Sequence, residues 1–216
     1  MSIHKTYAVF GLGRYGSAVA GELCANGAEV IAVDRDEAAV ENAIPFLPVC
    51  KCADVTDPEV IAKLGIANVD AVVIAMAGSM EASIMATMLC KEAGVPTVIA
   101  KCCNEMHGRI LNRVGADKVV FPENESGKRL ARNLLSSGFI DMAELSDQIS
   151  IVELTVRDEW IGKSLAELRL REKHEINVIA VIRNGRADIS INPTAPIQPG
   201  MRLIVVANTA KLKKMK

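Results

Sequence analysis

Aromatic side chains are scarce in this sequence, and its positive and negative charges nearly cancel. Phe, Trp and Tyr make up 3% of the residues, and the formal net charge is -1 at pH 7. Nucleic-acid-binding proteins need a basic surface or aromatic side chains on which bases stack. The composition therefore excludes DNA and RNA as expected partners.

Long apolar runs and paired cysteine motifs are also missing. No run reaches the roughly 20 residues of a membrane span, and Met1 to Lys5 lead into the first apolar segment without a signal-peptide core. The six cysteines include no C-x-x-C pair, and the three histidines are isolated. We therefore expect reduced thiols, no structural zinc and a cytoplasmic protein.

Short apolar strands alternate with helix-length amphipathic segments through the first two thirds of the chain. Such alternation is typical of a parallel sheet covered by helices on both faces. The fold class we predict is α/β, with a Rossmann-type doubly wound parallel sheet in the strand order 3-2-1-4-5-6. The six predicted strands are Tyr7–Phe10, Val30–Val33, Pro48–Cys52, Ala71–Ala75, Thr97–Ala100 and Lys118–Phe121.

A glycine-rich turn follows the first predicted strand. Its sequence is Gly11-Leu12-Gly13-Arg14-Tyr15-Gly16, and a helix-like segment from Ser17 to Asn26 comes directly after it. Glycines in this spacing let the backbone approach a pyrophosphate, which the N–H groups at the helix start attract. Asp34, at the end of the second strand, lies where a carboxylate accepts hydrogen bonds from ribose hydroxyls. A nucleotide is therefore the expected ligand.

The pattern changes after a helix predicted over Glu123 to Leu135. Ser136-Ser137-Gly138 breaks that helix, Phe139 to Leu145 forms a connection, and strand-like alternation begins near Ile149. Asn184-Gly185 between two apolar runs predicts a hairpin. We place the domain boundary near residue 140, with a nucleotide-binding domain over 1–140 and a smaller α/β C-terminal module over 141–216.

Several motifs together resemble a known family. They are the glycine turn, Asp34-Arg35-Asp36, Ala53-Asp54-Val55-Thr56-Asp57, Gly115-Ala116-Asp117, Phe121-Pro122-Glu123, Gly162 to Leu168, Asn177 to Val181 and Pro199 to Leu203. These segments resemble the RCK (regulator of potassium conductance) proteins, and in particular the cytosolic subunits of Ktr/Trk-type potassium uptake systems. The resemblance covers essentially the whole chain.

The resemblance implies a gating subunit and not an enzyme. Homodimers of such subunits assemble into an octameric ring on the inner face of the cell membrane, where they gate a membrane-embedded potassium-translocating subunit in response to ATP or ADP. By the same resemblance Arg14 reaches the terminal phosphate, Asp34 holds the ribose and the loop Ala53-Asp54-Val55 flanks the adenine. Glu123 corresponds to a ligand for Mg²⁺ or Ca²⁺ near the phosphates.

The remaining candidate residues come from two considerations. Lys101 ends the fifth strand, at the sheet edge where ligands of such folds bind, and Tyr15 and Arg35 belong to the motifs named above. Some relatives in the resembled family also bind cyclic di-AMP in the C-terminal module, and the resemblance implies a second site at Arg171, Ile176, Asn177 and Pro193.

Two other functional classes stay open. An NAD-dependent oxidoreductase or NAD(H)-sensing regulator would use the same glycine turn, and NAD remains a possible cofactor. An oxidoreductase also needs a general acid or base, for which His174 is the obvious candidate. A transcription regulator needs a helix-turn-helix and a basic face, and the sequence shows neither.

Overall fold

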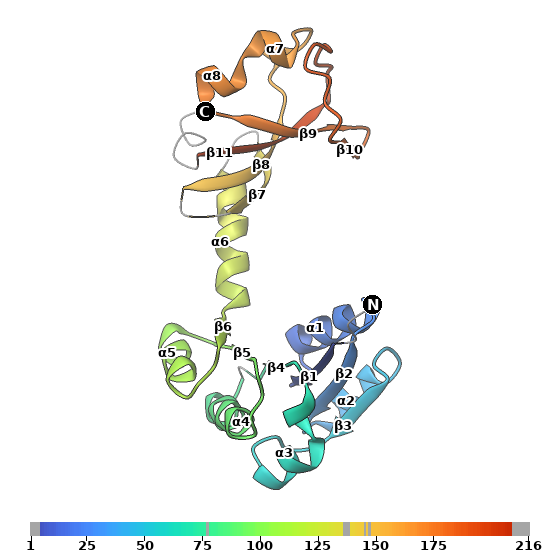
Figure 1. Ribbon diagram of the computed structural model, residues 1–216, viewed down its shortest axis with the longest axis vertical. Coiled ribbons are helices and arrows are strands. Elements are labelled where there is room, and N and C mark those ends of the chain that lie inside the picture. The colour runs from blue at the N-terminus through green and yellow to red at the C-terminus, as the bar shows by residue number, and fades with distance from the viewer. Residues whose placement is uncertain (1–4, 77, 136–138, 145, 147, 209–216) are drawn as a thin grey trace. The chain divides into compact units, whose positions relative to one another are not determined.

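The chain folds into two compact units, residues 1–122 and residues 123–216 (Figure 1). The computed structural model describes residues 5–76, 78–135, 139–144, 146 and 148–208. The domain boundary predicted near residue 140 lies on the other side of one helix, α6 (Pro122–Leu135), from the boundary between these two units. The contacts assign nearly all of α6 to the second unit, whereas the sequence prediction included it in the first.

The first unit contains a six-stranded parallel sheet. Its strand order is β3-β2-β1-β4-β5-β6, as predicted from the alternation of strands and helices. Strands β2 and β3 follow β1 toward one edge of the sheet. Strand β4 then lies on the other side of β1, and β5 and β6 continue from it to the opposite edge. The strands are β1 (Thr6–Phe10), β2 (Glu29–Asp34), β3 (Val49–Cys52), β4 (Ala71–Ile74), β5 (Val98–Lys101) and β6 (Lys118–Val120).

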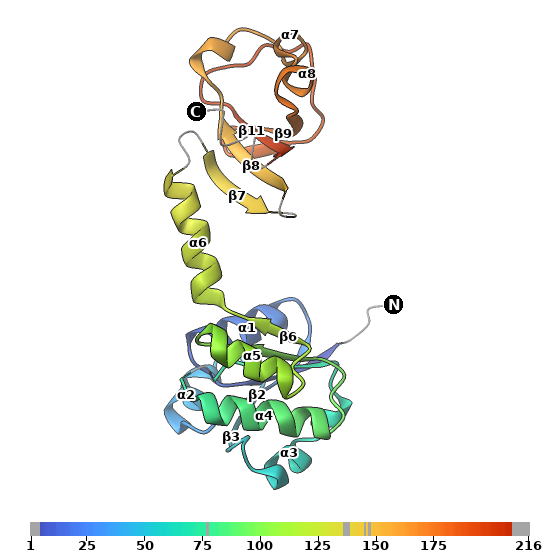
Figure 2. The ribbon, with the colours of Figure 1, turned by 90° about the vertical axis from the view of Figure 1, so that its left-hand side faces the viewer.

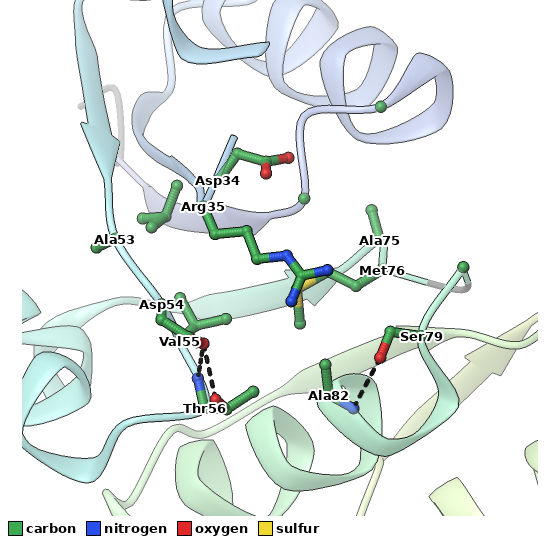
Figure 3. A pocket seen from close by; sticks show the side chains of 14 residues that line it. Asp34, Arg35, Ala53, Asp54, Val55, Thr56, Ala75, Met76, Ser79 and Ala82 are labelled. Carbon is green, nitrogen blue, oxygen red and sulfur yellow. Dashed lines mark hydrogen bonds between the residues drawn. The ribbon is translucent and has the colours of Figure 1, made fainter. Parts of the chain in front are cut away.

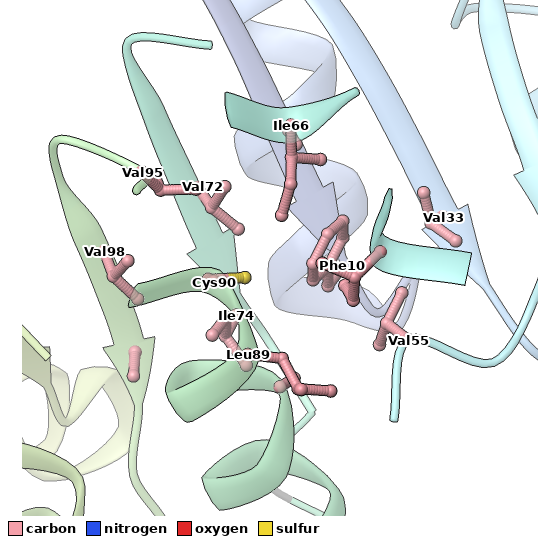
Figure 4. Packing of buried hydrophobic residues seen from close by; sticks show 14 of the residues in the cluster. Phe10, Val33, Val55, Ile66, Val72, Ile74, Leu89, Cys90, Val95 and Val98 are labelled. Atoms are coloured by element: carbon pink, nitrogen blue, oxygen red, sulfur yellow. The ribbon is translucent and has the colours of Figure 1, made fainter. Parts of the chain in front are cut away.

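Helices cover both faces of this sheet (Figure 2). Alternate residues of β1 enter different apolar clusters, because successive side chains of a strand point to opposite faces. Ala8 and Phe10 pack with residues of α3, α4 and α5, and Figure 4 shows Phe10 within this cluster. Val9 packs with residues of α1 and α2. The helices are α1 (Arg14–Ala25), α2 (Glu37–Ala43), α3 (Pro58–Leu64), α4 (Met80–Glu92) and α5 (Glu105–Arg113), with a 3-10 turn at Ile66–Asn68.

A buried histidine ties α5 to α4. His107 is fully buried, and its Nε2 lies 2.8 Å from the hydroxyl oxygen of Ser83. The backbone N–H of Cys103 donates to His107 Nδ1 at 3.3 Å, so the ring proton lies on Nε2. The Ser83 hydroxyl in turn donates to the carbonyl of Met80, at the start of α4. Burial lowers the pKa of His107, because the charged ring would lose its hydration.

This histidine predicts acid sensitivity of the first unit. A histidine with a lowered pKa binds fewer protons folded than unfolded, so the free energy of unfolding should fall as the pH drops below about 6.5. Urea denaturation of the wild type and of His107→Asn between pH 5 and 8 measures this slope. We expect the variant to be less stable at pH 8 and to lose less stability on acidification. Equal slopes in the two proteins would contradict the assignment.

The second unit contains an antiparallel five-stranded sheet in the order β10-β9-β11-β8-β7. The strands are β7 (Phe139–Glu144), β8 (Ile149–Thr155), β9 (Asn177–Arg183), β10 (Arg186–Asp188) and β11 (Arg202–Asn208). Two short helices, α7 (Leu165–Leu168) and α8 (Leu170–His174), follow a 3-10 turn at Asp158–Trp160. Their apolar side chains pack on the sheet around Trp160, Ile176 and Leu203.

One strand of this sheet was not predicted from the sequence, whereas its hairpin was. The segment predicted as a connection forms β7, which pairs with β8 at the edge of the sheet. The hairpin prediction is confirmed, because Asn184 and Gly185 join β9 to β10 with φ values of 50° and 76°. Positive φ at both central residues matches the right-handed twist of the two strands. The basic end of the chain, Lys211 to Lys216, lies outside the described residues.

None of the described helices combines the length and the apolar character that crossing a bilayer requires.

Candidate functional site

A cavity of about 390 Å³ opens at the carboxyl ends of the first four strands of the parallel sheet (Figure 3). It lies at the topological switch point between β1 and β4, where the order of the strands reverses. Ligands of doubly wound folds usually bind at this position. Four loops contribute to the cavity. The lining residues are Gly11, Gly13, Val33, Asp34, Arg35, Ala53, Asp54, Val55, Thr56, Ala75, Met76, Gly78, Ser79 and Ala82.

The glycine turn approaches both the sheet and α1 closely. Gly11 has a φ of 94°, which residues with a side chain rarely adopt, and its N–H donates to the carbonyl of Val33 at 2.8 Å. A Cβ atom on Gly16 would lie 1.8 Å from the carbonyl oxygen of Gly11. A Cβ atom on Gly13 would meet nothing within 4 Å. Gly11 and Gly16 are therefore required by packing, whereas Gly13 leaves open space over the first turn of α1.

The start of α1 differs from the starts of α2 to α5. Gly13 is its N-cap and offers no side-chain oxygen, and its first turn holds no acidic residue. Each of the next four helices has a side-chain N-cap and an acidic residue in its first turn. Those N-caps are Asp36, Asp57, Ser79 and Asn104. The positive end of the α1 dipole is thus left for an external anion.

Asp34 joins the glycine turn to the end of β2. Its Oδ2 accepts a hydrogen bond from the backbone N–H of Leu12 at 2.6 Å, and its Oδ1 accepts from the N–H of Asp36 at 2.9 Å. Each carboxylate oxygen keeps acceptor capacity for a further donor, since it has two lone pairs. Asp34 lines the cavity next to the α1 start, so a ligand with an anionic group and a hydroxyl-bearing sugar matches both.

The β3–α3 loop forms the other end of the cavity. Asp54 Oδ1 accepts hydrogen bonds from the backbone N–H and the hydroxyl of Thr56, at 2.9 and 2.7 Å. These hydrogen bonds, the backbone one first, hold the pKa of Asp54 below its usual range, and the positive charge of Arg35 lowers it further. Figure 3 shows the Arg35 side chain reaching across the cavity toward Met76.

Seven of the twelve residues predicted for the nucleotide site line the cavity: Gly11, Gly13, Asp34, Arg35, Ala53, Asp54 and Val55. Leu12 is buried behind the turn and donates its N–H to Asp34, and Gly16 packs against Gly11. Arg14 and Tyr15 belong to the first turn of α1, outside the cavity lining. Lys101 is outside the lining too, and its Nζ lies 5.5 Å from the centroid of the Tyr15 ring, within cation–π range.

The β4–α4 loop also contributes to the cavity, which was not predicted from the sequence. Ala75, Met76, Gly78 and Ser79 of this loop line the cavity, and so does Ala82 in the first turn of α4. The predicted strand order placed β4 beside β1. Gly78-Ser79, directly before the helix predicted from Met80, indicates a loop that ends at the N-terminus of that helix. These two signals together would have found the loop.

Glu123, the predicted cation ligand, lies exposed in the first turn of α6. Among the described residues there is no group of three or more His, Cys, Asp and Glu side chains that could hold a metal ion. His174, the candidate acid or base of an oxidoreductase, ends α8 as an exposed residue of the second unit.

The second unit has a cavity of its own, of about 410 Å³. It lies between the α7–α8 segment, the start of β9 and the stretch that leads from β10 to β11. It brings together all four residues of the predicted second site, Arg171, Ile176, Asn177 and Pro193. The other lining residues are Leu165, Ala166, Arg169, Leu170, Glu172, Val178 and Ile191.

Known solved structures share the fold. The GsuK channel matches with a TM-score of 0.55 at 22% identity, over 98% of this chain and 38% of that one. The GsuK channel bound to NAD matches with a TM-score of 0.53 at 23% identity, over 97% of this chain and 37% of that one. The TrkA-N domain of the inner membrane protein ybaL from Escherichia coli has a TM-score of 0.54 at 15% identity, over 62% of this chain and 99% of that one.

Sequence comparison identifies both units. The TrkA-N domain model matches residues 7–122, and the TrkA-C domain model matches residues 149–216. Ktr system potassium uptake protein C of Bacillus subtilis is 35% identical over 210 residues, which are 97% of this chain and 95% of that protein. Ktr system potassium uptake protein A of Vibrio alginolyticus is 34% identical over 208 residues, 96% of this chain and 94% of that one. The chain therefore belongs to the family of Ktr/Trk potassium uptake proteins built from a TrkA-N and a TrkA-C domain.

Proposed function

We propose that this chain is a nucleotide-sensing gating subunit of a bacterial potassium uptake system, and that it performs no catalysis itself. In this proposal it acts in the cytoplasm, at the inner face of the membrane, on a membrane-embedded potassium-translocating subunit. Family membership supports the link to potassium uptake. The observation that carries nucleotide sensing is the uncapped start of α1, which faces a cavity with Asp34 beside it.

Different regions of the cavity would bind the phosphates, the ribose and the base of the nucleotide. Phosphate oxygens would accept hydrogen bonds from the N–H groups at the start of α1, where the helix dipole favours negative charge. The ribose hydroxyls would donate to Asp34, whose position the Leu12 and Asp36 N–H groups fix. The base would then lie toward Ala53 to Thr56.

ATP and ADP are the nucleotides that we propose, with NAD as the alternative. Arg14 is the exposed first residue of α1, so its positive charge adds to that of the helix end. A guanidinium at this place favours the ligand with more phosphate charge. A ligand shifts a conformational equilibrium only through a difference in affinity between the states, and the ATP–ADP difference would supply it. The GsuK channel bound to NAD supports the alternative.

Replacing Arg14 tests the ATP–ADP proposal. We expect Arg14→Ala to weaken ATP binding ~10-fold or more, equivalent to about 1.4 kcal/mol, and to weaken ADP binding less. Isothermal titration calorimetry of the intact protein with ATP, ADP, NAD and NADH measures both losses. Arg109→Ala removes an exposed arginine of α5 and serves as the control, which should change neither affinity. Equal losses for ATP and ADP would refute the role of Arg14.

A divalent cation and a ring assembly complete the proposal. Mg²⁺ or Ca²⁺ would accompany the phosphates, and the exposed carboxylate of Glu123 is of the ligand type that both ions prefer. Homodimers would assemble into an octameric ring. Light scattering of the purified protein tests the assembly, and a monomer at all concentrations would contradict it.

Cyclic di-AMP is the ligand that we propose for the cavity of the second unit. Arg171 and Arg169 supply positive charge for phosphodiester groups, and Ile176, Ile191 and Pro193 supply apolar surface for bases. Asn177 adds a side-chain amide that both donates and accepts hydrogen bonds. Titration of cyclic di-AMP into the wild type and into Arg171→Ala tests this site, and the absence of binding heat in the wild type would end the proposal.

A further inference from the structure

Cys103 and His107 bring a thiol and an imidazole together at the start of α5. Cys103 is exposed in the loop from β5 to α5, directly before Asn104, the N-cap of that helix. Its Sγ lies 3.3 Å from Nδ1 of His107, in the first turn of α5. Neither residue lines the cavity of the first unit or that of the second. The proposed function therefore gives this pair no role.

The ring of His107 is oriented as a base toward the sulfur. Its proton lies on Nε2, which donates to the hydroxyl oxygen of Ser83 at 2.8 Å, so Nδ1 accepts from Cys103. Burial lowers the pKa of His107, and the ring is therefore neutral at pH 7. Ser83 gives its own proton to the carbonyl of Met80, so it accepts from Nε2 whether the ring is neutral or charged. Nδ1 can thus take up the thiol proton.

Asn104 supplies a hydrogen-bond donor to the same sulfur. Its Nδ2 donates to Sγ of Cys103 at 3.5 Å, and its Oδ1 accepts from the backbone N–H of His107 at 2.8 Å. The second hydrogen bond fixes the amide with its NH₂ group toward the sulfur. The positive end of the α5 dipole begins one residue after Cys103. Negative charge that develops on Sγ during a reaction is therefore stabilised from two sources.

The other five cysteines lack this combination of exposure and a neighbouring base. Four of them are buried or half-buried: Cys24, Cys50, Cys90 and Cys102. Burial raises the pKa of Cys90 to about 12, so that thiol stays protonated. Cys52 is exposed, but its thiol donates to the backbone carbonyl of Arg35, and a carbonyl oxygen does not take up the proton. Cys52 is therefore the matched comparison for Cys103.

We propose that Cys103 is a modification site that forms a mixed disulfide with low-molecular-weight disulfides, and that His107 acts as the general base. Sγ attacks one sulfur of the disulfide while its proton passes to Nδ1 of His107. The new Sγ–S bond forms as the S–S bond of the reagent breaks, and the departing sulfur takes the proton and leaves as a thiol. Cys103 is oxidised and the departing half is reduced, so the step needs no further oxidant. Excess thiol reverses it.

The rate of exchange with dithiodipyridine, an uncharged disulfide, tests the assignment in the full chain. Absorbance of the released pyridinethione follows the reaction, and mass spectrometry of peptides identifies the modified cysteine. We expect Cys103 to react ~10-fold or more faster than Cys52, because a positioned base assists only Cys103. Cys103→Ser should abolish the fast phase, and Cys52→Ser should retain it. Equal rates at the two cysteines, or a fast phase that survives in Cys103→Ser, would overturn the proposal.

Two variants that keep Cys103 test its neighbours. His107→Asn removes the base and should slow modification of Cys103 ~10-fold or more. That change alters a buried residue, so Asn104→Asp provides a second variant. Aspartate keeps an oxygen for the N-cap of α5 and serves as well there as asparagine. It replaces the NH₂ donor by a carboxylate oxygen, so the sulfur faces negative charge, and we expect a several-fold slower reaction.

The rate at Cys52 and the circular dichroism spectrum show that each variant keeps the wild-type fold. An unchanged rate at Cys103 in either variant would overturn the proposal. Hydroxyethyl disulfide extends the test to an aliphatic reagent. We expect its first adduct on Cys103 and recovery of the free thiol with dithiothreitol, whereas a first adduct on any other cysteine would contradict the assignment. None of these measurements involves a nucleotide, so their outcome is independent of the proposed function.

Discussion

Replacement of Gly16 by alanine is expected to destabilise the first unit by ~3 kcal/mol or more. The added Cβ would lie 1.8 Å from the carbonyl oxygen of Gly11 and 3.1 Å from Cβ of Ala75. Backbone cannot move aside as the end of a flexible side chain can, so α1 would have to shift away from β1. The third glycine of the turn therefore serves helix–strand packing, and its loss should be visible without any nucleotide.

Gly13→Ala is the matched control for this prediction. Its φ of -66° suits any residue, and its Cβ would meet nothing within 4 Å. Urea denaturation without ligand should give nearly wild-type stability for Gly13→Ala and a large loss for Gly16→Ala. With ATP present, Gly13→Ala should gain less stability than the wild type, because its Cβ occupies space over the α1 start where phosphate would lie. Similar stability of the two variants would contradict the packing argument.

Asp34→Ala is expected to weaken binding of ATP, ADP and NAD ~100-fold, equivalent to about 3 kcal/mol. The change removes the acceptor for the ribose hydroxyls. It also leaves the N–H of Leu12 without the acceptor that it has at 2.6 Å, so the glycine turn loses a contact that fixes it. Calorimetry with all three nucleotides measures the loss, which should be similar for each, because each carries the adenosine ribose.

Asp36→Ala separates the ligand effect from general damage to this loop. Asp36 is the N-cap of α2, and its Oδ1 accepts from the N–H of Ala38 at 3.1 Å. It lies two residues from Asp34 but does not line the cavity. Its loss should cost about 1 kcal/mol of stability, as cap losses do, and leave nucleotide affinity unchanged. A comparable affinity loss in both variants would show that Asp34 acts through the loop and not on the sugar.

Local patterns were sufficient for most elements of the chain. The alternation of apolar strands and helices predicted the parallel sheet and its strand order, because parallel strands buried on both faces need continuous apolar residues. The Asn184-Gly185 hairpin followed from the positive φ that both residues tolerate. Strand β7 was missed, because its mixed sequence Phe-Ile-Asp-Met-Ala-Glu forms a strand through pairing with β8. Pairing between segments is not encoded in the periodicity of either one.

By itself, the sequence determined the doubly wound architecture, the glycine turn and the carboxylate of Asp34, since each depends on residue types at short spacing. The tertiary structure alone decided which side chains share a cavity. It brought Met76 and Ser79 of the β4–α4 loop and Ala82 of α4 into the cavity that Asp54 lines, and left Lys101 over the ring of Tyr15. The physical reason is that a cavity at a sheet edge is built from loops far apart in the chain. Their side-chain directions follow from strand pairing and helix packing, which no local pattern specifies.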